Sequence, residues 1–392
     1  MSDLNGSANE YERIRRRIAS AKTVVVKIGS SSLTKPSGHI DAEKIERFAA
    51  GVAALATPEM RIVVVSSGAI AAGFGPLGFS DRPKDVSTAQ AAASVGQGII
   101  MSCYEKAFAK HGYKVGQILI TAADTVRPEQ YRNVQRTLNR LLDLKAVPIV
   151  NENDALASNE IRFGDNDRLS ALVANIVRAD ALILLTDVDG LYTAPPTEPQ
   201  AKKIKFVPDV LKIIEKVNAG GTGTNRGTGG MITKLEAARV AAVSGIPAVL
   251  ARAEDIAPAL AGDAVGTFFA PIKSRGTFRR LWIGFASYPY GAYVADDGAA
   301  KAVLSGRASL LSAGVSGVKG EFSAGDPVWI EDKNGNKIAK GLSGFDSEEV
   351  GRTLGLSTAA LREKLGEEYA HPLVHRDNLV LLSKSAADKQ AA

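Results

Sequence analysis

Two lysines lie where an anion could bind. Lys27 is near the end of the apolar run TVVVKI at residues 23–28, and Lys234 follows the glycine-rich stretch GGTGTNRGTGGMIT at 220–233. The stretch has neither the glycine–lysine–serine/threonine ending of a P-loop nor the G-x-G-x-x-G spacing of a dinucleotide loop. It is therefore either a plain glycine loop with a surface lysine, or an anion site in which glycine amides, a helix N-terminus and Lys234 act together.

Carboxylates and amides gather in two short segments, NENDA at 151–155 and GDND at 164–167. No histidine or cysteine accompanies them, so a zinc site is not expected. Oxygen ligands of this kind suit Mg²⁺, an ammonium group or the orientation of lysine side chains. The structural alternative is capping of the helix that follows GDND, which would account for only some of these side chains. The candidates are Glu152, Asp154, Asp165, Asp167, Asn151, Asn153 and Asn166.

Further polar loops follow the other apolar runs. They are KIGSSSL (27–33), SSGAIAAG (66–73), TAAD (121–124) and TDVDGLY (186–192). Ligands of open α/β sheets bind beyond the carboxyl ends of the strands, so these loops are expected to meet at one site. Gly68 would let the backbone approach a ligand, and a helix beginning near Ala69 would present free N–H groups. The structural alternatives are simple turns, one capped by Ser66 or Ser67 and one at 189–190.

Six short apolar runs alternate with longer helical patterns up to about residue 272. The runs are rich in Val and Ile and apolar on both sides, which is typical of parallel strands buried between helix layers. We predict an α/β fold, a three-layer αβα sandwich around an open, mainly parallel sheet. The expected strands are 23–28, 61–65, 115–121, 147–150, 181–186 and 247–251, and the expected helices lie near 41–56, 87–111, 128–144, 167–179 and 231–244.

The pattern changes after about residue 280, where short apolar runs are separated by Gly and Asp turns. The Asn-Gly pair within KNGNK, at 333–337, is a strong hairpin signal. A small, mostly β second domain is predicted there. The expected organisation is a flexible extension at 1–20, a first domain at 21–272, a linker at 273–280, the second domain at 281–382 and a flexible tail at 383–392.

The composition is that of a soluble globular protein, with 392 residues, 45% hydrophobic and 23% charged. No run reaches the roughly 18 apolar residues of a membrane helix, and the N-terminus lacks a secretory signal. Cys103 is the only cysteine, so no internal disulfide can form and a cytoplasmic location is expected. A net charge of +6 fits anionic ligands such as nucleotides; it permits nucleic acid without demanding it.

Taken together, the loops resemble those of the amino-acid kinase superfamily, and within it the glutamate 5-kinase family. The motifs are VVVKIGSSSLT, VVVSSGAIAAG, VPIVNENDA, FGDNDRLSALVA, LLTDVDGLYT and GTGGMITKLEAA. The segments VKGEFSAGDPVWI and AHPLVHRDNLVLL are similar to the PUA domain that ends the long bacterial form. The resemblance covers about residues 21–380, and the extension at 1–20 is not part of the family's core pattern.

The resemblance implies ATP-dependent phosphorylation of the side-chain carboxylate of L-glutamate to L-glutamyl 5-phosphate, the first step of proline biosynthesis. ATP and Mg²⁺ would be the cofactors, and proline would inhibit by feedback. The resemblance also implies a homo-oligomer, a dimer or tetramer, and functional coupling to glutamyl-phosphate reductase. The acceptor carboxylate, with a reference pKa of about 4.3, is ionised at pH 7, so no general base is needed.

The resemblance assigns roles residue by residue. The catalytic residues would be Lys27, Asp167 and Lys234. Glutamate would be held by Ser67, Gly68, Asn151, Asp154 and Asn166. ATP would contact Lys27, Gly29, Thr186, Asp187, Thr228, Gly229, Gly230, Met231 and Lys234. Mg²⁺ would be held mainly by the ATP phosphates, and Asp167 is the one protein ligand considered for it.

Three alternatives remain open. The chain could be another enzyme of the amino-acid kinase fold with a different acid or a nucleotide as substrate. It could also be an RNA-binding protein acting through the PUA-like domain. That domain has no long basic run, because Lys333, Lys337 and Lys340 are interspersed with Asp and Glu, so RNA is not the expected partner. A third interpretation makes the β domain an oligomerisation or regulatory element.

Overall fold

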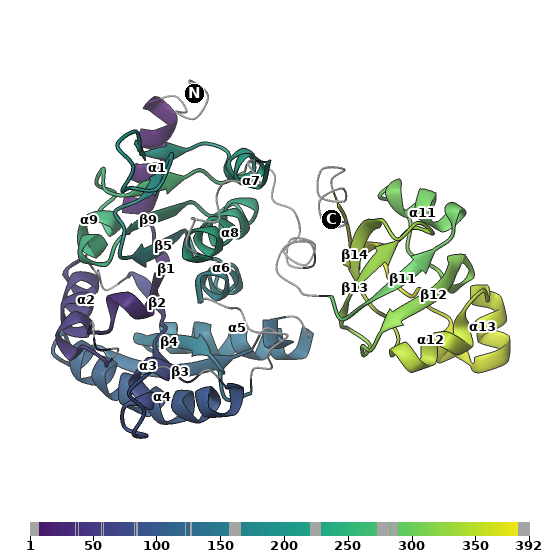
Figure 1. Ribbon diagram of the computed structural model, residues 1–392, viewed down its shortest axis with the longest axis horizontal. Helices are drawn as coiled ribbons and strands as arrows, with labels where there is room; N and C mark the ends of the chain where they lie inside the picture. Colours follow the sequence, from purple (N-terminus) through teal and green to yellow (C-terminus); the bar gives the residue numbers. More distant parts are fainter. Residues whose placement is uncertain are drawn as a thin grey trace. The chain divides into compact units, whose positions relative to one another are not determined.

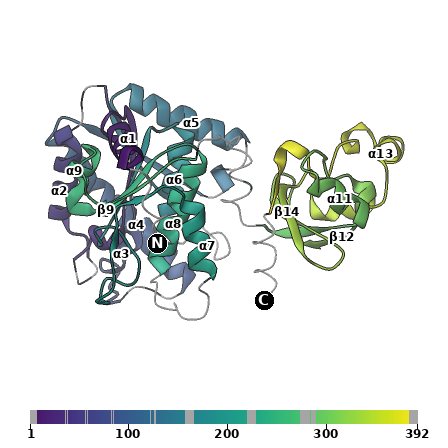
Figure 2. The same ribbon diagram turned by 90° about the horizontal axis from the view of Figure 1, so that it is seen from above.

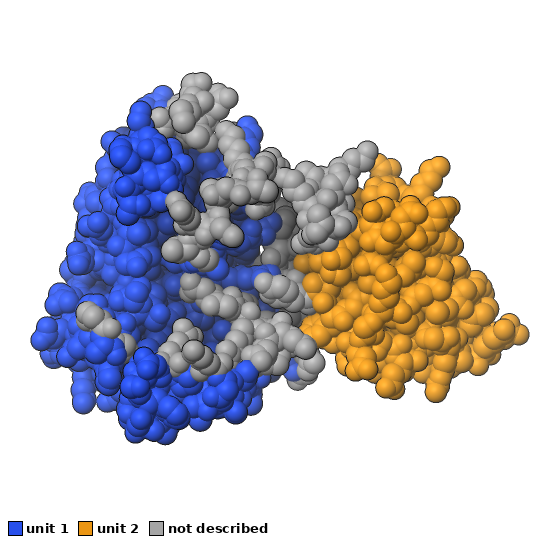
Figure 3. Space-filling view, viewed as in Figure 1, with its two compact units in different colours: residues 1–275 blue, residues 276–392 orange. Residues whose placement is uncertain are grey.

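The chain forms two compact units, Met1–Arg275 and Gly276–Ala392 (Figure 3). The division falls within the linker expected at 273–280, a segment that lies outside the described residues. The computed structural model describes residues 8–35, 37, 39–55, 57, 59–81, 83, 85–121, 123–125, 128–156, 166–219, 229–272, 283 and 289–382. Within these ranges no helix combines the length and the apolar character needed to cross a membrane.

An eight-stranded sheet organises the first unit, in the order β3-β4-β2-β1-β5-β9-β10-β8 (Figure 1). The strands from β3 to β9 pair in parallel, and β10 pairs with β9 antiparallel. The predicted mainly parallel sheet is therefore confirmed. The strands are β1 Thr23–Ile28, β2 Arg61–Val65, β3 Lys114–Ile120, β4 Ala146–Glu152, β5 Ala181–Thr186, β8 Phe206–Val207, β9 Ala248–Arg252 and β10 Thr267–Phe269. A separate antiparallel pair consists of β6 Leu191–Tyr192 and β7 Lys203–Ile204.

Helices cover both faces of this sheet, as the three-layer prediction requires (Figures 1 and 2). One layer contains α1 Ala8–Ala19, α2 Ala42–Leu55, α4 Val86–Ala109 and α9 Ile256–Leu260, and its core includes Val24 and Val26 of β1. The other contains α5 Pro128–Asp143, α6 Asn166–Ile176, α7 Val210–Ala219 and α8 Gly229–Val243. Side chains alternate along a strand, so Lys27 lies on the face opposite Val26, towards α6 and α8.

The prediction of a flexible extension is wrong for residues 8–19, which form the helix α1. Ile14 and Ile18, four residues apart on one side of the helix, are 2% and 1% exposed. Tyr11 on the same helix packs against Phe206 and Phe268, with ring centroids 5.6 and 5.5 Å apart. The segment is polar on average, and its narrow apolar stripe is enough to attach it to the sheet. Residues 1–7 lie outside the described part of the chain.

The expectation that every strand is buried on both sides is wrong for β3. This strand is the first in the sheet order, and Lys114, Gln117 and Leu119 are exposed. A strand at the edge has a neighbour on one side only, so its side chains are less completely covered.

The second unit is built on a five-stranded sheet in the order β12-β11-β13-β14-β15. Its strands are β11 Gly291–Ala295, β12 Val315–Gly320, β13 Pro327–Glu331, β14 Lys337–Leu342 and β15 Leu379–Leu381. The hairpin predicted at KNGNK is confirmed, since β13 and β14 pair antiparallel and Gly335 has a φ of 83°. Short α-helices accompany the sheet in the described part of this unit: α11 Asp297–Leu304, α12 Ser347–Thr353 and α13 Thr358–Leu365.

Candidate active site

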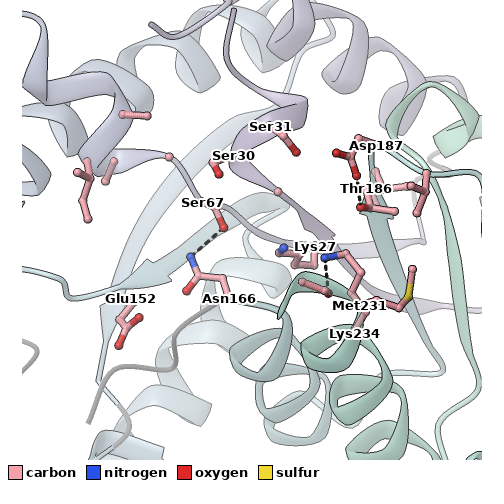
Figure 4. A pocket seen from close by; sticks show the side chains of 18 of the residues that line it. Lys27, Ser30, Ser31, Ser67, Glu152, Asn166, Thr186, Asp187, Met231 and Lys234 are labelled. Carbon is pink, nitrogen blue, oxygen red and sulfur yellow. Dashed lines mark hydrogen bonds between the residues drawn. The ribbon is translucent and has the colours of Figure 1, made fainter. Parts of the chain in front are cut away.

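A cavity of about 700 Å³ opens at the carboxyl ends of β1, β2, β4 and β5 (Figure 4). It therefore lies where ligands of open α/β sheets bind. One end is formed by serines, an amide and carboxylates, and the other by glycine, serine and threonine at turns and a helix start. The lining residues are Lys27, Gly29, Ser30, Ser31, Ser67, Gly68, Ala69, Ile70, Ala71, Glu152, Asp154, Asn166, Leu185, Thr186, Asp187, Val188, Gly230, Met231 and Lys234.

A buried group of three charges occupies the middle of the site. Lys27 Nζ lies 2.6 Å from Asp167 Oδ1, and Lys234 Nζ lies 3.1 Å from Asp167 Oδ2. Asp167 is 0% exposed, and the side chains of Lys27 and Lys234 are 1% and 10% exposed. Two cations and one anion carry one net positive charge together. Such an arrangement favours an anionic ligand in the adjoining cavity.

Three elements bring this charge group together. Lys27 comes from β1, Asp167 from the first turn of α6 and Lys234 from the second turn of α8. Thr233 Oγ1 donates to Asp167 Oδ2 at 2.9 Å, and Lys234 Nζ donates to Gly230 O at 3.0 Å. The Thr233 bond and the Lys234–Asp167 ion pair join the start of α8 to α6, and both ammonium groups face Asp167 before a ligand arrives.

The glycine, serine and threonine end offers hydrogen-bond donors. The turn Ser30–Ser32 follows Gly29 directly after β1, and Thr186 Oγ1 donates to Asp187 Oδ1 at 2.9 Å at the end of β5. The 15-residue helix α8 begins at Gly229, and its residues Gly230 and Met231 line the cavity. The N–H groups at the start of a helix and its dipole both favour an anion such as phosphate.

The other end is organised around Asn166, the first residue of α6. Its Nδ2 donates to Ser66 O at 2.6 Å, to Asn151 Oδ1 at 2.6 Å and to Ser67 Oγ at 3.2 Å. Gly68, with a φ of 98°, is the N-cap residue of α3 Ala69–Phe74 and makes no side-chain cap bond. Neither Ser66 nor Ser67 is the N-cap residue, so the capping alternative for this loop is wrong.

Most of the predicted site residues meet in this cavity. Its lining includes Lys27, Gly29, Ser67, Gly68, Asp154, Asn166, Thr186, Asp187, Gly230, Met231 and Lys234. Asn151 and Asp167 are buried beside it, and Gly229 is the first residue of α8. Thr228, Asp165 and the glycines at 220–227 lie outside the described residues. None of the four histidines belongs to the described lining.

Sequence reasoning missed one buried residue of the site. Gln97 of α4 accepts a hydrogen bond from Asn151 Nδ2 at 2.9 Å and is 8% exposed. It lies in the middle of a helix, outside every polar loop, so its position in the sequence gives no signal of a site. Ser30, Ser31 and Glu152 line the cavity too; the sequence placed the serines in a polar loop and Glu152 among the acidic candidates, and the resemblance assigned none of the three a role.

The fold and the cavity define the class of the protein. The amino acid kinase family model matches residues 22–252, a range that includes all the described residues lining the cavity. The chain therefore belongs to the amino acid kinase family. A second family model, that of the PUA domain, matches residues 291–365 of the second unit.

Relatives that align with nearly the whole chain show which branch of the family it belongs to. The glutamate 5-kinase of Bifidobacterium adolescentis is 66% identical over 370 residues, which are 94% of this chain and 98% of the relative. The glutamate 5-kinase of Streptomyces avermitilis is 51% identical over 371 residues, with coverage of 94% and 98%. Within its family the chain is thus a member of the glutamate 5-kinases, and the resemblance found in the motifs is confirmed.

Proposed function

We propose that the protein transfers the γ-phosphoryl group of ATP to the side-chain carboxylate of L-glutamate, giving L-glutamyl 5-phosphate and ADP. This is the first step of proline biosynthesis. The observation that carries the proposal is the group Lys27, Asp167 and Lys234, which lies between the amide end and the glycine-serine end of one cavity. The relatives named glutamate 5-kinase support glutamate as the acceptor.

The acceptor carboxylate is already a nucleophile. Its reference pKa of about 4.3 leaves it ionised at neutral pH, so the absence of histidine from the described lining is no obstacle. A carboxylate oxygen forms a bond to the γ-phosphorus while the bond to the oxygen bridging to the β-phosphate breaks, and that oxygen leaves with ADP. The difficulty is the approach of two anions, together with the charge that spreads over the phosphoryl oxygens.

The two lysines would neutralise part of this negative charge. One ammonium group would face the phosphoryl group under attack and the other the leaving side. Asp167 holds both by ion pairs, at 2.6 and 3.1 Å, so they need not reorganise during transfer. Preorganised charges of this kind stabilise a transition state more than a ground state.

Mg²⁺ fits this site as a companion of ATP. No cluster of three or more His, Cys, Asp or Glu side chains able to hold a metal occurs among the described residues. Both oxygens of Asp167 already face lysines, so this carboxylate is a weak candidate for a direct ligand. Mg²⁺ commonly binds through substrate phosphates, where it neutralises part of their charge. We therefore expect the ATP phosphates to supply most of its ligands.

The remaining predicted residues divide between the two ends. We assign glutamate to Ser67, Gly68, Asn151, Asp154 and Asn166, with Asp154 paired to the α-ammonium group. ATP is assigned to Lys27, Gly29, Thr186, Asp187, the segment 228–231 and Lys234. We also propose feedback inhibition by proline through the glutamate loops at about 151–170, a dimer or tetramer, coupling to glutamyl-phosphate reductase, and a cytoplasmic location.

The direct test measures ADP release from ATP and Mg²⁺ with and without L-glutamate, in the presence of hydroxylamine. Hydroxylamine converts an acyl phosphate into a hydroxamate, which is detected by its iron complex. We expect hydroxamate formed in proportion to ADP, and only when L-glutamate is present. A panel with D-glutamate, L-aspartate, carbamate and UMP is the control. Turnover of another member of the panel without hydroxamate from L-glutamate would refute the proposal in favour of a different amino acid kinase.

A further inference from the structure

The helix α4 places two polar side chains against the amide end of the cavity. Gln97 and Tyr104 are seven residues, about two helical turns, apart and so lie on one side of α4. Gln97 reaches Asn151 at the end of β4, and the Tyr104 hydroxyl lies 2.9 Å from Ser66 Oγ just beyond β2. Gln97 is 8% and Tyr104 is 0% exposed, and neither lines the cavity. Both therefore act on the site through other residues.

Backbone groups fix the orientation of the amides in this network. The backbone N–H of Glu152 donates to Asn151 Oδ1 at 3.0 Å, so that atom must be the carbonyl oxygen. Asn151 Nδ2 then faces Gln97, which must present its oxygen to accept the bond at 2.9 Å. The Asn166 atom near Ser66 O must be the nitrogen, because a backbone carbonyl only accepts. The orientation of each amide follows from fixed donors and acceptors.

One polar atom of Asn166 is left over. Its Nδ2 has three acceptors within 3.2 Å for its two hydrogens, whereas its Oδ1 is buried without a hydrogen-bond partner among the described residues. Asn166 lines the cavity, and Figure 4 shows its nitrogen directed to Ser67 and its oxygen turned away from that bond. A buried acceptor without a partner is costly unless a ligand supplies a donor. The α-ammonium group of an amino acid is such a donor.

We propose that Gln97 is a positioning residue for the amino-acid substrate. Its side-chain oxygen holds Asn151 Nδ2, and this leaves Asn151 Oδ1 to hold Asn166 Nδ2. Asn166 is thereby fixed with its carbonyl oxygen available to the substrate ammonium. The inference rests on the proposed glutamate site, and it adds a residue from a helix that does not itself line the cavity.

The test compares Gln97→Met with Gln97→Glu in the full chain. Methionine has a similar length but no strong acceptor, so the Asn151 amide loses its fixed orientation. We expect the KM for L-glutamate to rise on the order of tenfold, in line with the loss of a buried hydrogen bond, while kcat and the KM for ATP stay within about twofold. Glutamate at position 97 keeps an acceptor and should recover most of the loss. Gln90→Met, the same change on the same helix outside the cavity lining, is the control and should change neither KM.

Glutarate distinguishes positioning from a general structural role. It has both carboxylates of glutamate and no ammonium group, so its inhibition constant should stay within about twofold in Gln97→Met. Equal weakening of glutarate and glutamate, or failure of Gln97→Glu to recover binding, would overturn the proposal. If Gln97→Met does not fold, Gln97→Asn gives the same comparison, because its amide is too short to reach Asn151.

Asn166→Ala separates this inference from the proposed site. If it leaves the KM for glutamate unchanged, the assignment of glutamate to this end of the cavity is wrong. If it raises that KM and Gln97→Met does not, only the positioning role of Gln97 is wrong.

Discussion

Among the single residues, Asp167 holds the two lysines of the site together. This carboxylate, with 0% exposure, is stabilised by Lys27 and Lys234, which face its two oxygens, and by the Thr233 hydroxyl. Removing one partner of a buried ion pair commonly costs about 3–5 kcal/mol, because the remaining charge stays buried. Replacing Asp167 would therefore lower stability and leave two ammonium groups facing each other. For that reason the lysines, and not Asp167, are the better positions at which to test the chemistry.

Asp154 is expected to act on one substrate only. It lines the cavity and lies two residues beyond the end of β4, the strand that also carries Asn151. Asp154→Asn should raise the KM for L-glutamate by about ten- to a hundredfold, the value of a charged hydrogen bond, and leave the KM for ATP within about twofold. Steady-state kinetics with each substrate varied in turn checks this. Equal loss for both substrates would identify Asp154 as a structural residue instead.

Charged residues at strand ends and helix starts could be singled out from the sequence. A buried residue that only orients other side chains could not. Lys27, Asp167 and Lys234 were predicted from charged residues at strand ends and helix starts, with roles supplied by the resemblance. Gln97 lies 54 residues from Asn151 in the chain, and no spacing rule connects them. Only the packing of α4 against the strand ends brings the two side chains together.

At the scale of elements, two glycines allow α3 and α4 to pack closely. A Cβ atom at Gly96 would meet the Ala69 carbonyl oxygen and would lie 2.6 Å from Gly73 N. A Cβ atom at Gly73 would collide with the Ala92 carbonyl oxygen. Because α3 starts directly after Gly68, this contact also holds one wall of the cavity in place.

The contact can be tested with two alanine substitutions on α4. Gly96→Ala should lower the free energy of unfolding by about 1–3 kcal/mol and raise the KM for glutamate, because the two helices must separate. Gly98→Ala should raise the free energy of unfolding by about 0.5–1 kcal/mol, since nothing lies within 4 Å of an added Cβ and alanine favours a helix. Denaturant unfolding measures both. Similar changes in the free energy of unfolding for Gly96→Ala and Gly98→Ala would show that close approach of α3 and α4 is unimportant for stability.

The helix α1 is expected to contribute to the stability of the first unit. Ile14 and Ile18 are buried in the same core as β1 and α9. Alanine at either position should cost about 2–5 kcal/mol of unfolding free energy. Arg13→Ala is the control, since 64% of that side chain is exposed and its ion pair with Glu10 is worth little. Unchanged free energy of unfolding in both isoleucine variants would show that α1 does not stabilise the first unit.

The elements differ in how well their patterns predict them. The strands at 23–28, 61–65 and 181–186 have the predicted bounds, because continuous Val- and Ile-rich runs fit strands buried on both sides. The strands β8 and β10 were missed because two or three residues are too few for a period to be visible. Helix α1 was missed because its residues are polar on average. Only its contacts with the rest of the unit show that Ile14 and Ile18 are buried.

At the scale of the whole molecule, catalysis and the PUA domain belong to separate units. Each has a hydrophobic core of its own, one around β1 and the other around Tyr293 and Val328. All the described residues that line the cavity lie within the first unit. The change of pattern near residue 280 predicted this division from the sequence. The same pattern does not indicate what the second domain does.

A chain that ends at residue 275 should therefore fold and keep glutamate-dependent kinase activity. We expect kcat and both KM values within about threefold of the full-length protein, because every assigned contact is retained. Circular dichroism and the hydroxamate assay measure folding and activity. A folded but inactive truncated protein would show that the second domain takes part in catalysis, for example by organising an active oligomer.

Lys27 and Lys234 are expected to stabilise the transferring phosphoryl group. Single-turnover measurement of ATP cleavage in Lys234→Ala tests this role, with enzyme in excess over ATP and concentrated enough to bind all of it, and with L-glutamate saturating. We expect a rate lower by about a hundred- to a thousandfold with little change in glutamate affinity, and no change in Lys212→Ala, an exposed lysine of α7. An unchanged single-turnover rate accompanied by weaker substrate binding would contradict it.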